Sequence, residues 1–311
     1  MSCCVESEWI QDFCRSAGIL FRAGEPLWRH TSLRIGGPAE MALFPDEASL
    51  PGLVSLLNRR GVPVTILGGG TNVLVDDGGI DGAVIFTARL DALRSAAPPG
   101  RLDVLSGCPM RRLIGLSLKS GLSGMEGLAG IPGSLGGAIA GNAGSFGYEI
   151  KDVLVAITLL KCDGQMMTIA PSEACFSYRR TSITPEFLIL GATLSLTPDD
   201  PQEVRARVSA FMKEKQARQP LRRRSAGCVF KNSGGAPAGL LMDEAECKGM
   251  RVGGVAVSDL HANYFVNTHG GTAEDFLRLM DAVSRRVRER FGVILDPEIR
   301  VLGKKAAASR I

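Results

Sequence analysis

The sequence predicts a mixed α/β or α+β protein with two or three domains. Short strand-like runs alternate with helical segments along the chain. An Asp-Gly pair at 163–164 lies between two β-rich runs and indicates a hairpin. The length of 311 residues is sufficient for more than one hydrophobic core.

In the first half of the chain, residues 46–60 predict a helix, with Asp46 as its N-cap and Gly61 as its stop. A second helix is expected over 111–119, ending at Gly121. The strands expected in this half are 63–67, 73–75, 83–86 and 101–106.

In the second half, the predicted hairpin pairs residues 153–162 with 165–170, and a further strand covers 187–196. The two prolines of segment 198–201 suggest a domain boundary before a helix at 202–217. The last third predicts helices at 237–244 and 272–291 and strands at 253–257, 264–267 and 293–302.

Residues 121–147 form the most informative segment, because ten of these 27 positions are glycine. A flexible linker would lack apolar residues, whereas here five of them are interleaved: Met125, Leu128, Ile131, Leu135 and Ile139. Glycine lets the backbone approach a ligand closely and adopt positive φ. We therefore expect a buried, ordered segment that cradles a ligand, with tight packing of elements as the alternative.

A second glycine cluster, GGGTN at 68–72, lies between two strand-like runs. It lacks the Gly-Lys-Ser/Thr of a Walker loop and does not open a helix as a Rossmann turn does. Its backbone amides can still form a nest for a pyrophosphate. The alternative is a plain turn between strands.

Composition excludes several classes of protein. The net charge is +4 and aromatic residues make up 5%, so the arginine run at 222–224 is not expected to bind nucleic acid. No run of 18 apolar residues is present, and the N-terminal residues lack a signal-peptide pattern. We therefore expect a cytoplasmic protein with no membrane partner.

The eight cysteines contain no C-x-x-C pair, and only three histidines are present. The usual zinc spacings cannot be assembled from them. We expect no metal, and we expect most of the cysteines to be reduced, buried and small apolar residues.

Seven motifs occur in order along the chain: HTSLRIGG at 30–37, GGGTN at 68–72, GIPGSLGGA…NAG at 130–144, YR at 178–179, SAGCVFKN at 225–232, HAN at 261–263 and PEI at 297–299. Together they resemble the MurB family, the UDP-N-acetylenolpyruvoylglucosamine reductases of peptidoglycan synthesis. The resemblance covers about residues 18–303. Since only 44 residues separate Arg180 from Ser225, it is to the shorter type II form, which lacks an inserted lid module.

The resemblance implies an α+β fold: a PCMH/VAO-type FAD-binding domain of two subdomains (18–88 and 89–199) and a C-terminal α+β substrate domain (201–303). It implies noncovalent FAD, reduction by NADPH, a UDP-sugar enolpyruvate substrate and a cytoplasmic monomer. Hydride would pass from flavin N5 to the enolpyruvyl group.

The resemblance also assigns roles to residues. Arg179 would bind the enolpyruvyl carboxylate through its planar fork, with Arg180 as the less favoured choice. Glu298 would stabilise the enol or donate a proton, and Cys228 would be the proton donor. Residues at matching cofactor positions are Arg34, Ile35, Gly36, Gly37, Leu67, Gly68, Gly69, Gly70, Thr71, Asn72, Val73, Leu74, Gly130, Ile131, Pro132, Gly133, Ser134, Gly136, Gly137, Ala138, Asn142, Ala143 and Gly144. Weaker substrate-binding candidates are Tyr178, Lys231, Asn232 and His261.

The chain departs from the family pattern at three positions. Cys228 stands where serine is usual, and a thiol with a pKa near ~8.5 is a stronger acid than an alcohol. Ser233 and Arg224 each replace a usual proline. Two other functions remain open: another PCMH-type flavoprotein, such as an oxidase, and a non-catalytic protein that binds flavin or a UDP-sugar.

Overall fold

The computed structural model describes residues 8–183, 187–232 and 236–303. Ser233 and two of the eight cysteines, Cys3 and Cys4, lie outside these ranges. The described chain divides into two compact units. Unit 1 contains residues up to Glu25, then Glu40–Gly69 and Gly82–Phe211, and unit 2 contains Pro26–Ala39, Gly70–Asp81 and the residues from Met212 onward.

Unit 1 begins with helix α1 (Glu8–Ser16) and a four-stranded sheet in the order β1-β2-β5-β3. The strands of this sheet are β1 (Leu20–Pro26), β2 (Pro38–Phe44), β5 (Ile80–Phe86) and β3 (Val64–Leu67). Strands β3 and β5 are parallel, with Val64 opposite Ala83. Helix α2 (Leu50–Arg59) connects β2 to β3.

Helix α2 starts four residues later than the sequence predicts, at Leu50. The Asp46 carboxylate accepts hydrogen bonds from the Ser49 amide (2.9 Å) and hydroxyl (2.6 Å). These bonds stabilise a separate turn before the helix, so the predicted cap forms a turn instead.

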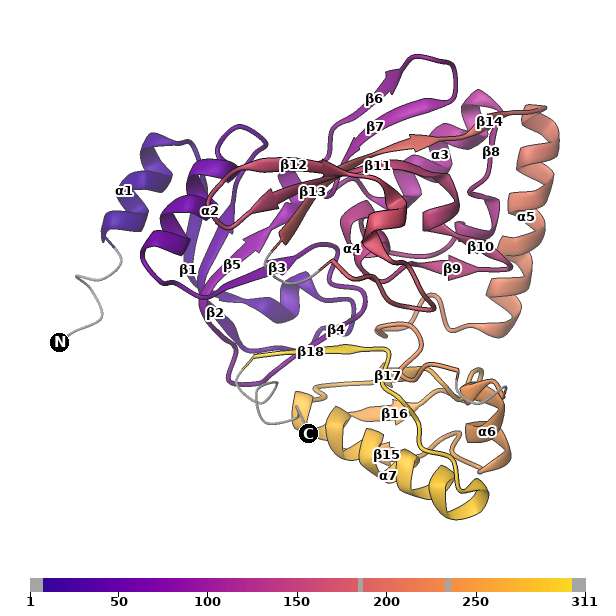
Figure 1. The fold of residues 1–311 in the computed structure, drawn as a ribbon. Coiled ribbons are helices and arrows are strands. Elements are labelled where there is room, and N and C mark those ends of the chain that lie inside the picture. The colour runs from indigo at the N-terminus through magenta and orange to yellow at the C-terminus, as the bar shows by residue number, and fades with distance from the viewer. Residues whose placement is uncertain (1–7, 184–186, 233–235, 304–311) are drawn as a thin grey trace. The chain divides into compact units, whose positions relative to one another are not determined.

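The second sheet of unit 1 has five strands in the order β12-β11-β13-β7-β6 (Figure 1). Its strands are β6 (Leu93–Ala96), β7 (Arg101–Leu105), β11 (Leu154–Lys161), β12 (Met166–Ile169) and β13 (Phe187–Ser195). The β11–β12 hairpin around Asp163-Gly164 confirms the prediction, with Leu160 opposite Met166. Apolar residues of α1, α2 and both sheets form one core that includes Ile10, Leu53, Ile85 and Leu160.

Helix α3 (Met110–Ser120) ends where the sequence predicts, because Gly121 adopts a left-handed C-cap with φ of 59°. The other elements of unit 1 are η2 (Thr87–Arg89), β8 (Leu122–Ser123), η3 (Glu126–Leu128), α4 (Leu135–Ala140), β9 (Gly144–Ser145), β10 (Tyr148–Glu149), η4 (Ile150–Val153), η5 (Pro171–Ala174), β14 (Thr197–Pro198) and α5 (Pro201–Arg218), whose last seven residues belong to unit 2.

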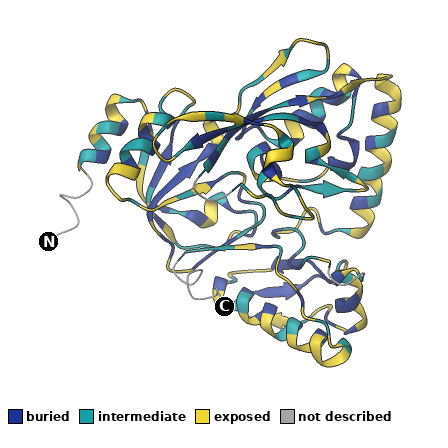
Figure 2. Ribbon diagram, viewed as in Figure 1, coloured by how far each residue is buried: buried dark blue, intermediate teal, exposed yellow. Residues whose placement is uncertain are grey.

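Unit 2 is built around the long helix α7 (Ala273–Phe291) and a three-stranded antiparallel sheet, β15-β16-β17. These strands are β15 (Arg251–Val252), β16 (Val255–Val257) and β17 (Phe265–Asn267), and the unit also contains η1 (Leu27–His30) and α6 (Ala238–Glu244). Phe230, Phe265 and Phe276 are fully buried in its core. Figure 2 shows the alternation of buried and exposed positions along α7.

A parallel pair of strands joins distant parts of the sequence within unit 2. Strand β4 (Val73–Val75) pairs with β18 (Arg300–Leu302), so Val73 lies opposite Arg300. Only these last three residues of the strand predicted at 293–302 form a strand. The core of unit 2 accordingly includes Leu33, Ile35 and Leu74 from early in the chain.

The prediction that most cysteines are buried is only half right for the described residues. Cys14, Cys108 and Cys247 are buried, while Cys162 and Cys175 are exposed and Cys228 is partly exposed. Among the described helices, none is long and apolar enough to cross a membrane.

Candidate active site

The two glycine segments pack directly against each other in unit 1. A Cβ atom on Gly69 would lie 2.6 Å from the Gly133 Cα, and one on Gly68 would lie 2.5 Å from the Ser134 Oγ. Real Cβ atoms essentially never approach other atoms so closely. Glycine is therefore required at 69 for the two loops to meet, whereas a larger residue at 68 would have to displace the Ser134 hydroxyl.

The glycine segment 121–147 is held in the core by its apolar side chains, while some of its other positions are exposed to solvent. Met125, Leu128, Leu135 and Ile139 are fully buried, as predicted, and Ile131 is half-buried. The glycines and proline exposed along the same segment are Gly130, Pro132, Gly137 and Gly147.

Three polar atoms beside this segment have unused hydrogen-bonding capacity. Ser106 Oγ, Ser134 Oγ and Asn142 Oδ1 are buried without a hydrogen-bond partner among the residues that the structure describes. A buried polar atom without a hydrogen bond destabilises the folded protein. Such atoms are therefore expected where a bound ligand supplies the missing hydrogen bond. Exposed glycine backbone beside such atoms fits a flat ligand with polar edges, such as a flavin.

Arg179 lines a cavity of about 490 Å³ next to this segment in unit 1. The cavity is lined by Gly144, Ser145, Gly147, Tyr148, Glu149, Lys151, Asp152, Tyr178 and Arg179. The Arg179 Nη2 donates to the Gly144 carbonyl at 2.8 Å, and its guanidinium lies 5.2 Å from the centre of the Tyr178 ring. Arg179 has a φ of 54°, a conformation that costs a non-glycine residue energy and is typical of functional sites.

Asn142 and Glu149 link this cavity to the glycine segment. Asn142 is fully buried with a φ of 40°, and its Nδ2 donates to the Ser177 carbonyl at 3.1 Å. Hydrogen bonds from Lys151 and Asn142, with the charge of Arg179 contributing less, hold the pKa of Glu149 below its usual value. The cavity therefore contains a negative charge close to Arg179, which fixes the guanidinium beside the glycine segment.

In unit 2, the segment around Cys228 is held by Asn263. The Val229 amide donates to the Asn263 carbonyl at 2.9 Å, and the Asn263 side chain bonds both the Phe230 amide (2.9 Å) and the Phe230 carbonyl (2.7 Å). Cys228 forms an antiparallel bridge with Tyr264. These contacts hold the backbone from Cys228 to Phe230 in place.

The structure brings Glu298 next to the same segment. Its amide donates to the Val229 carbonyl at 2.8 Å, and Phe230 bridges with Pro297. The Asn72 side chain donates to the Glu298 carbonyl at 3.2 Å, and the Arg300 amide donates to the Asn72 carbonyl at 3.1 Å. Asn72, Cys228 and Glu298 thus come from three distant motifs and share one cluster of unit 2.

The weaker candidates in unit 2 each have a partner within the chain. The Lys231 ammonium lies 2.7 Å from Asp296, and the Asn232 side chain accepts from the Ala238 amide at the start of α6 (3.0 Å). His261 Nδ1 accepts from the Asn263 amide at 3.2 Å. Burial, assisted by the nearby Lys248, lowers the pKa of His261 and favours the neutral ring that this bond requires.

Several glycines of the cofactor set are explained by packing of the chain on itself within unit 2. A Cβ on Gly36 would lie 2.7 Å from the Val75 Cβ, one on Gly37 would lie 2.2 Å from the Asp77 carbonyl oxygen, and one on Gly70 would lie 2.0 Å from the His30 carbonyl oxygen. No ligand is needed to account for these three.

Motif HTSLRIGG is fixed by polar contacts in unit 2. Ser32 donates to the Ser225 carbonyl at 2.6 Å, and the Asn267 side chain donates to the Leu33 carbonyl at 2.9 Å. Ile35 and Leu74 lie in the core, and Arg34 has a φ of 57°. This motif therefore supports the segment that carries Cys228.

The candidate residues fall into two groups. Arg179, Tyr178, Asn142 and Gly144 come together in unit 1, and Asn72, Cys228 and Glu298 come together in unit 2. Glu149, Lys151 and Asp152 in the cavity were not predicted, since charged residues between the glycine segment and the strand predicted at 153–162 resemble ordinary surface. Asn263 was also missed, although this residue is part of the HAN motif.

Two family models match the chain. The model described as UDP-N-acetylenolpyruvoylglucosamine reductase, C-terminal domain, matches residues 219–302, and the FAD binding domain model matches residues 38–170. Among curated relatives, the UDP-N-acetylenolpyruvoylglucosamine reductase of Rubrobacter xylanophilus is 44% identical over 284 residues, which cover 90% of this chain and 94% of the relative. The reductase of Geobacter metallireducens is 39% identical over 282 residues, which cover 90% and 93%.

Solved structures agree with these matches. The crystal structure of the UDP-N-acetylenolpyruvylglucosamine reductase (MurB) from Thermus caldophilus has a TM-score of 0.77 and 32% identity, covering 91% of this chain and 98% of that one. The Physcomitrella patens BBE-like 1 structure has a TM-score of 0.50 and 15% identity, covering 61% and 44%, and is similar in fold alone. The matches confirm the predicted α+β fold with a PCMH-type FAD-binding domain.

Proposed function

The chain belongs to the UDP-N-acetylenolpyruvoylglucosamine reductase family, and from this premise we propose that it reduces UDP-N-acetylglucosamine enolpyruvate to UDP-N-acetylmuramate with NADPH. The observation that carries the proposal is the cavity containing Arg179, which adjoins a glycine segment with buried, unsatisfied polar atoms. An arginine beside a glycine segment with unsatisfied polar atoms provides what a carboxylate substrate and a redox cofactor require together.

FAD is the cofactor of this family, and when bound it would supply the redox chemistry, taking a hydride from NADPH and passing one from N5 to the enolpyruvyl group. We propose that the exposed backbone at Gly130, Pro132 and Gly137 contacts the flavin, while Ser134 and Asn142 provide polar contacts. Loop 68–72 would hold the pyrophosphate through its amides. FAD binding is noncovalent in this proposal.

Arg179 is proposed to bind the carboxylate of the enolpyruvyl group. Negative charge builds up on this group as the double bond is reduced, so a fixed guanidinium stabilises the transition state more than the ground state. The bond to Gly144 and the charge of Glu149 fix the guanidinium in the cavity before substrate arrives. Preorganisation of this kind avoids a reorganisation cost during the reaction.

Cys228 is proposed as the donor of the proton that completes the reduction, with Glu298 stabilising the enol. The hydrogen bonds that hold the backbone at Val229 and Phe230 support this assignment, as does the bond from the Glu298 amide to Val229, the residue that follows the thiol. A positioned acid typically speeds a reaction 10²- to 10⁴-fold, which corresponds to lowering the activation barrier by ~2.7–5.5 kcal/mol.

Three further assignments belong to the proposal. Residues 18–88 and 89–199 would bind FAD and residues 201–303 would bind the substrate; an FAD binding domain model at 38–170 and a reductase C-terminal model at 219–302 support an FAD-binding part followed by a C-terminal part. The enzyme would act as a monomer. Its UDP-linked substrate and nicotinamide reductant would place it in the cytoplasm.

The decisive test follows the two half-reactions under anaerobic conditions. NADPH should bleach the visible absorbance of the purified yellow holoprotein, and UDP-N-acetylglucosamine enolpyruvate should restore it with formation of UDP-N-acetylmuramate. Bleaching followed by recovery with oxygen but not with the enolpyruvyl substrate would indicate an oxidase and contradict the proposal. A protein that binds FAD but is never reduced by NADPH would be a binding protein.

A further inference from the structure

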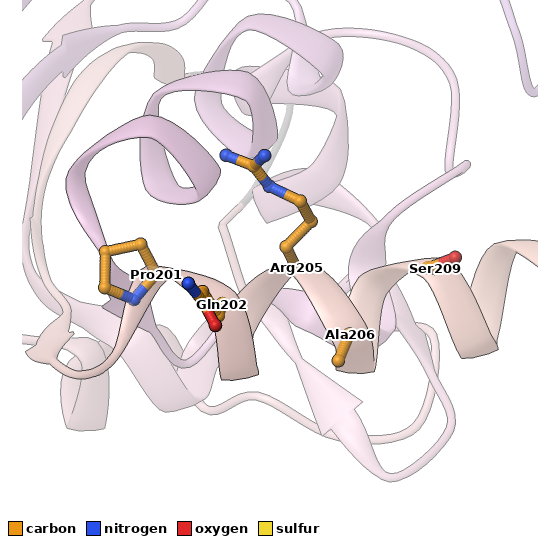
Figure 3. Close-up of a pocket in the computed structure, with 5 residues that line it drawn as sticks. All are labelled: Pro201, Gln202, Arg205, Ala206 and Ser209. Atoms are coloured by element: carbon orange, nitrogen blue, oxygen red, sulfur yellow. The ribbon is translucent and has the colours of Figure 1, made fainter.

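Helix α5 has two distinct faces within unit 1. Val204 and Val208 are buried, and Arg207 and Phe211, one helical turn apart, point to the same side. The exposed face contains Pro201, Gln202, Arg205, Ala206 and Ser209, which line a surface cavity of about 460 Å³ (Figure 3). The inner face instead contacts Glu126 and Phe146, which lie near the two ends of the glycine segment.

Arg207 is bound to residues near the upstream end of the glycine segment. Its Nε and Nη2 bond the same carboxylate oxygen of Glu126 at 3.0 and 2.8 Å. Glu126 is almost completely buried and also accepts from the Gly124 amide (2.7 Å) and the Ser123 hydroxyl (2.8 Å). Burial would raise the pKa of Glu126, but the Gly124 and Arg207 bonds hold it below its usual value.

A buried carboxylate with this many donors is charged and held in one position. Glu126 lies in η3, only four residues before Gly130, where the exposed part of the glycine segment begins. The contact with Arg207 therefore fixes the upstream end of that segment to α5.

Phe211 is bound to the downstream end of the same segment. Its ring stacks on Phe146 with centroids 4.7 Å apart and contacts the edge of Tyr148 at 5.8 Å. Phe146 and Gly147 form the two-residue turn of the β9–β10 hairpin, with φ values of 53° and 80°. Positive φ at both positions is typical of a type I′ turn and is unfavourable for an aromatic residue, so the stack compensates for a strained turn.

The β9–β10 hairpin provides the groups that fix Arg179. The Gly144 carbonyl accepts from Arg179, and Glu149 pairs with Gly144 across the hairpin. Any rotation of the hairpin consequently moves both the carbonyl and the carboxylate next to the guanidinium.

We propose that α5 is a brace for the site, with Arg207 a positioning residue for the flavin segment and Phe211 a positioning residue for Arg179. Neither side chain is among the described residues that line the Arg179 cavity. Both act through the ends of the segment that runs from Glu126 to Gly147. The role of Phe211 in turnover rests on the proposed function of Arg179, whereas the brace itself can be measured without it.

The first experiment compares two arginines on the same helix. Arg207→Met should increase release of FAD from the diluted holoprotein, read from the fluorescence of free flavin, by ~10- to 100-fold, the size of effect seen when an outer-shell partner of a metal site is lost. The matched control Arg205→Met, on the exposed face, should release FAD as the wild type does. Glu126→Gln, which keeps the volume and loses the charge, should show an intermediate increase. Equal release of FAD from Arg207→Met and Arg205→Met would refute the proposed role of Arg207 in positioning the flavin segment.

The second experiment tests Phe211. Phe211→Ala should speed hydrogen exchange of the amides at 144–149 about tenfold or more as local opening becomes easier. It should also slow flavin reoxidation by substrate, chiefly through a larger KM, while reduction by NADPH stays near normal. Phe211→Tyr keeps the ring and should restore both properties. In an Arg179→Lys background, Phe211→Ala should add little, because the two residues act through one contact.

Unchanged exchange at 144–149 in Phe211→Ala would refute the brace at this end. If Phe211→Ala slowed both half-reactions equally, in the wild type and in the Arg179→Lys background, Phe211 would not position Arg179. If Arg179→Lys alone left reoxidation normal, the proposed role of Arg179 would fail, while FAD release and hydrogen exchange would still decide the brace.

Discussion

Replacement of Gly69 by alanine tests the contact between the two glycine loops. The new Cβ would lie 2.6 Å from the Gly133 Cα, whereas contacts from about 3.4 Å upward are ordinary. The loops at 68–72 and 130–134 would therefore have to separate by about 0.8 Å. The atom in the way belongs to the backbone, so no side-chain rotation can relieve the overlap.

Overpacking of this size costs ~1–3 kcal/mol. If the loops regain their normal spacing only when FAD binds, the same cost appears as ~5- to 150-fold weaker FAD affinity. Gly115→Ala is the matched control, because a Cβ at this position of α3 meets nothing within 4 Å. It should gain up to ~1 kcal/mol in stability from its better helix propensity, with FAD affinity unchanged.

The assay is FAD titration of the apoprotein followed by flavin fluorescence, with thermal unfolding of both forms. The expected pattern is a weaker FAD affinity and a smaller increase of Tm on FAD binding in Gly69→Ala. Wild-type FAD affinity in Gly69→Ala would show that the loops need not be this close when the cofactor is bound.

Three further predictions concern the chemistry and the charge balance. Arg179→Lys keeps the charge but loses the fork, so stopped-flow absorbance should show slow reoxidation by substrate and near-normal reduction by NADPH. Equal loss in both steps would assign Arg179 to FAD binding. Cys228→Ala should slow reoxidation by ~10²- to 10⁴-fold, while Cys228→Ser should keep substantial activity and resist thiol reagents that inactivate the wild type. Near-normal turnover of Cys228→Ala would exclude the thiol as donor. Burial lowers the pKa of Lys215 to about 8, against about 10.4 in the unfolded chain. As the pH rises, Lys215 therefore loses its proton in the folded state before it does so in the unfolded chain. Between pH 8 and 10 the free energy of unfolding of the wild type should rise by ~1–3 kcal/mol more than that of Lys215→Met, as measured by chemical denaturation. Parallel pH profiles for the two proteins would contradict the buried, easily deprotonated lysine.

Local signals in the sequence predict much of the fold. The end of α3 at Gly121 and the β11–β12 hairpin at Asp163-Gly164 depend on residues next to one another, and both are confirmed. Strand β18 and the grouping of residues 26–39 and 70–81 with the C-terminal part depend on pairing between distant segments. Such pairing leaves no periodicity in a short window, so the predicted strand at 293–302 was too long and this grouping was not foreseen.

The site was predicted unevenly for a related reason. The sequence identifies positions that need glycine, but it cannot tell whether a ligand or the chain itself occupies the space. Gly37 and Gly70 were assigned to the cofactor, and their own carbonyl neighbours in unit 2 already require glycine. Glu149 and Lys151 were missed because only the three-dimensional structure places them in the cavity with Arg179.

The pairing of β4 with β18 has a consequence for synthesis of the protein on the ribosome. Arg300 follows its partner Val73 by 227 positions, and translation at ~5–20 residues per second delays the pairing by roughly 11–45 seconds. During this interval the 70–81 segment has emerged without the strand and the core residues that later cover Leu74. A nascent chain of this protein therefore exposes an apolar strand for tens of seconds, and pulse-labelled chains stalled before β18 should bind chaperones that recognise such strands.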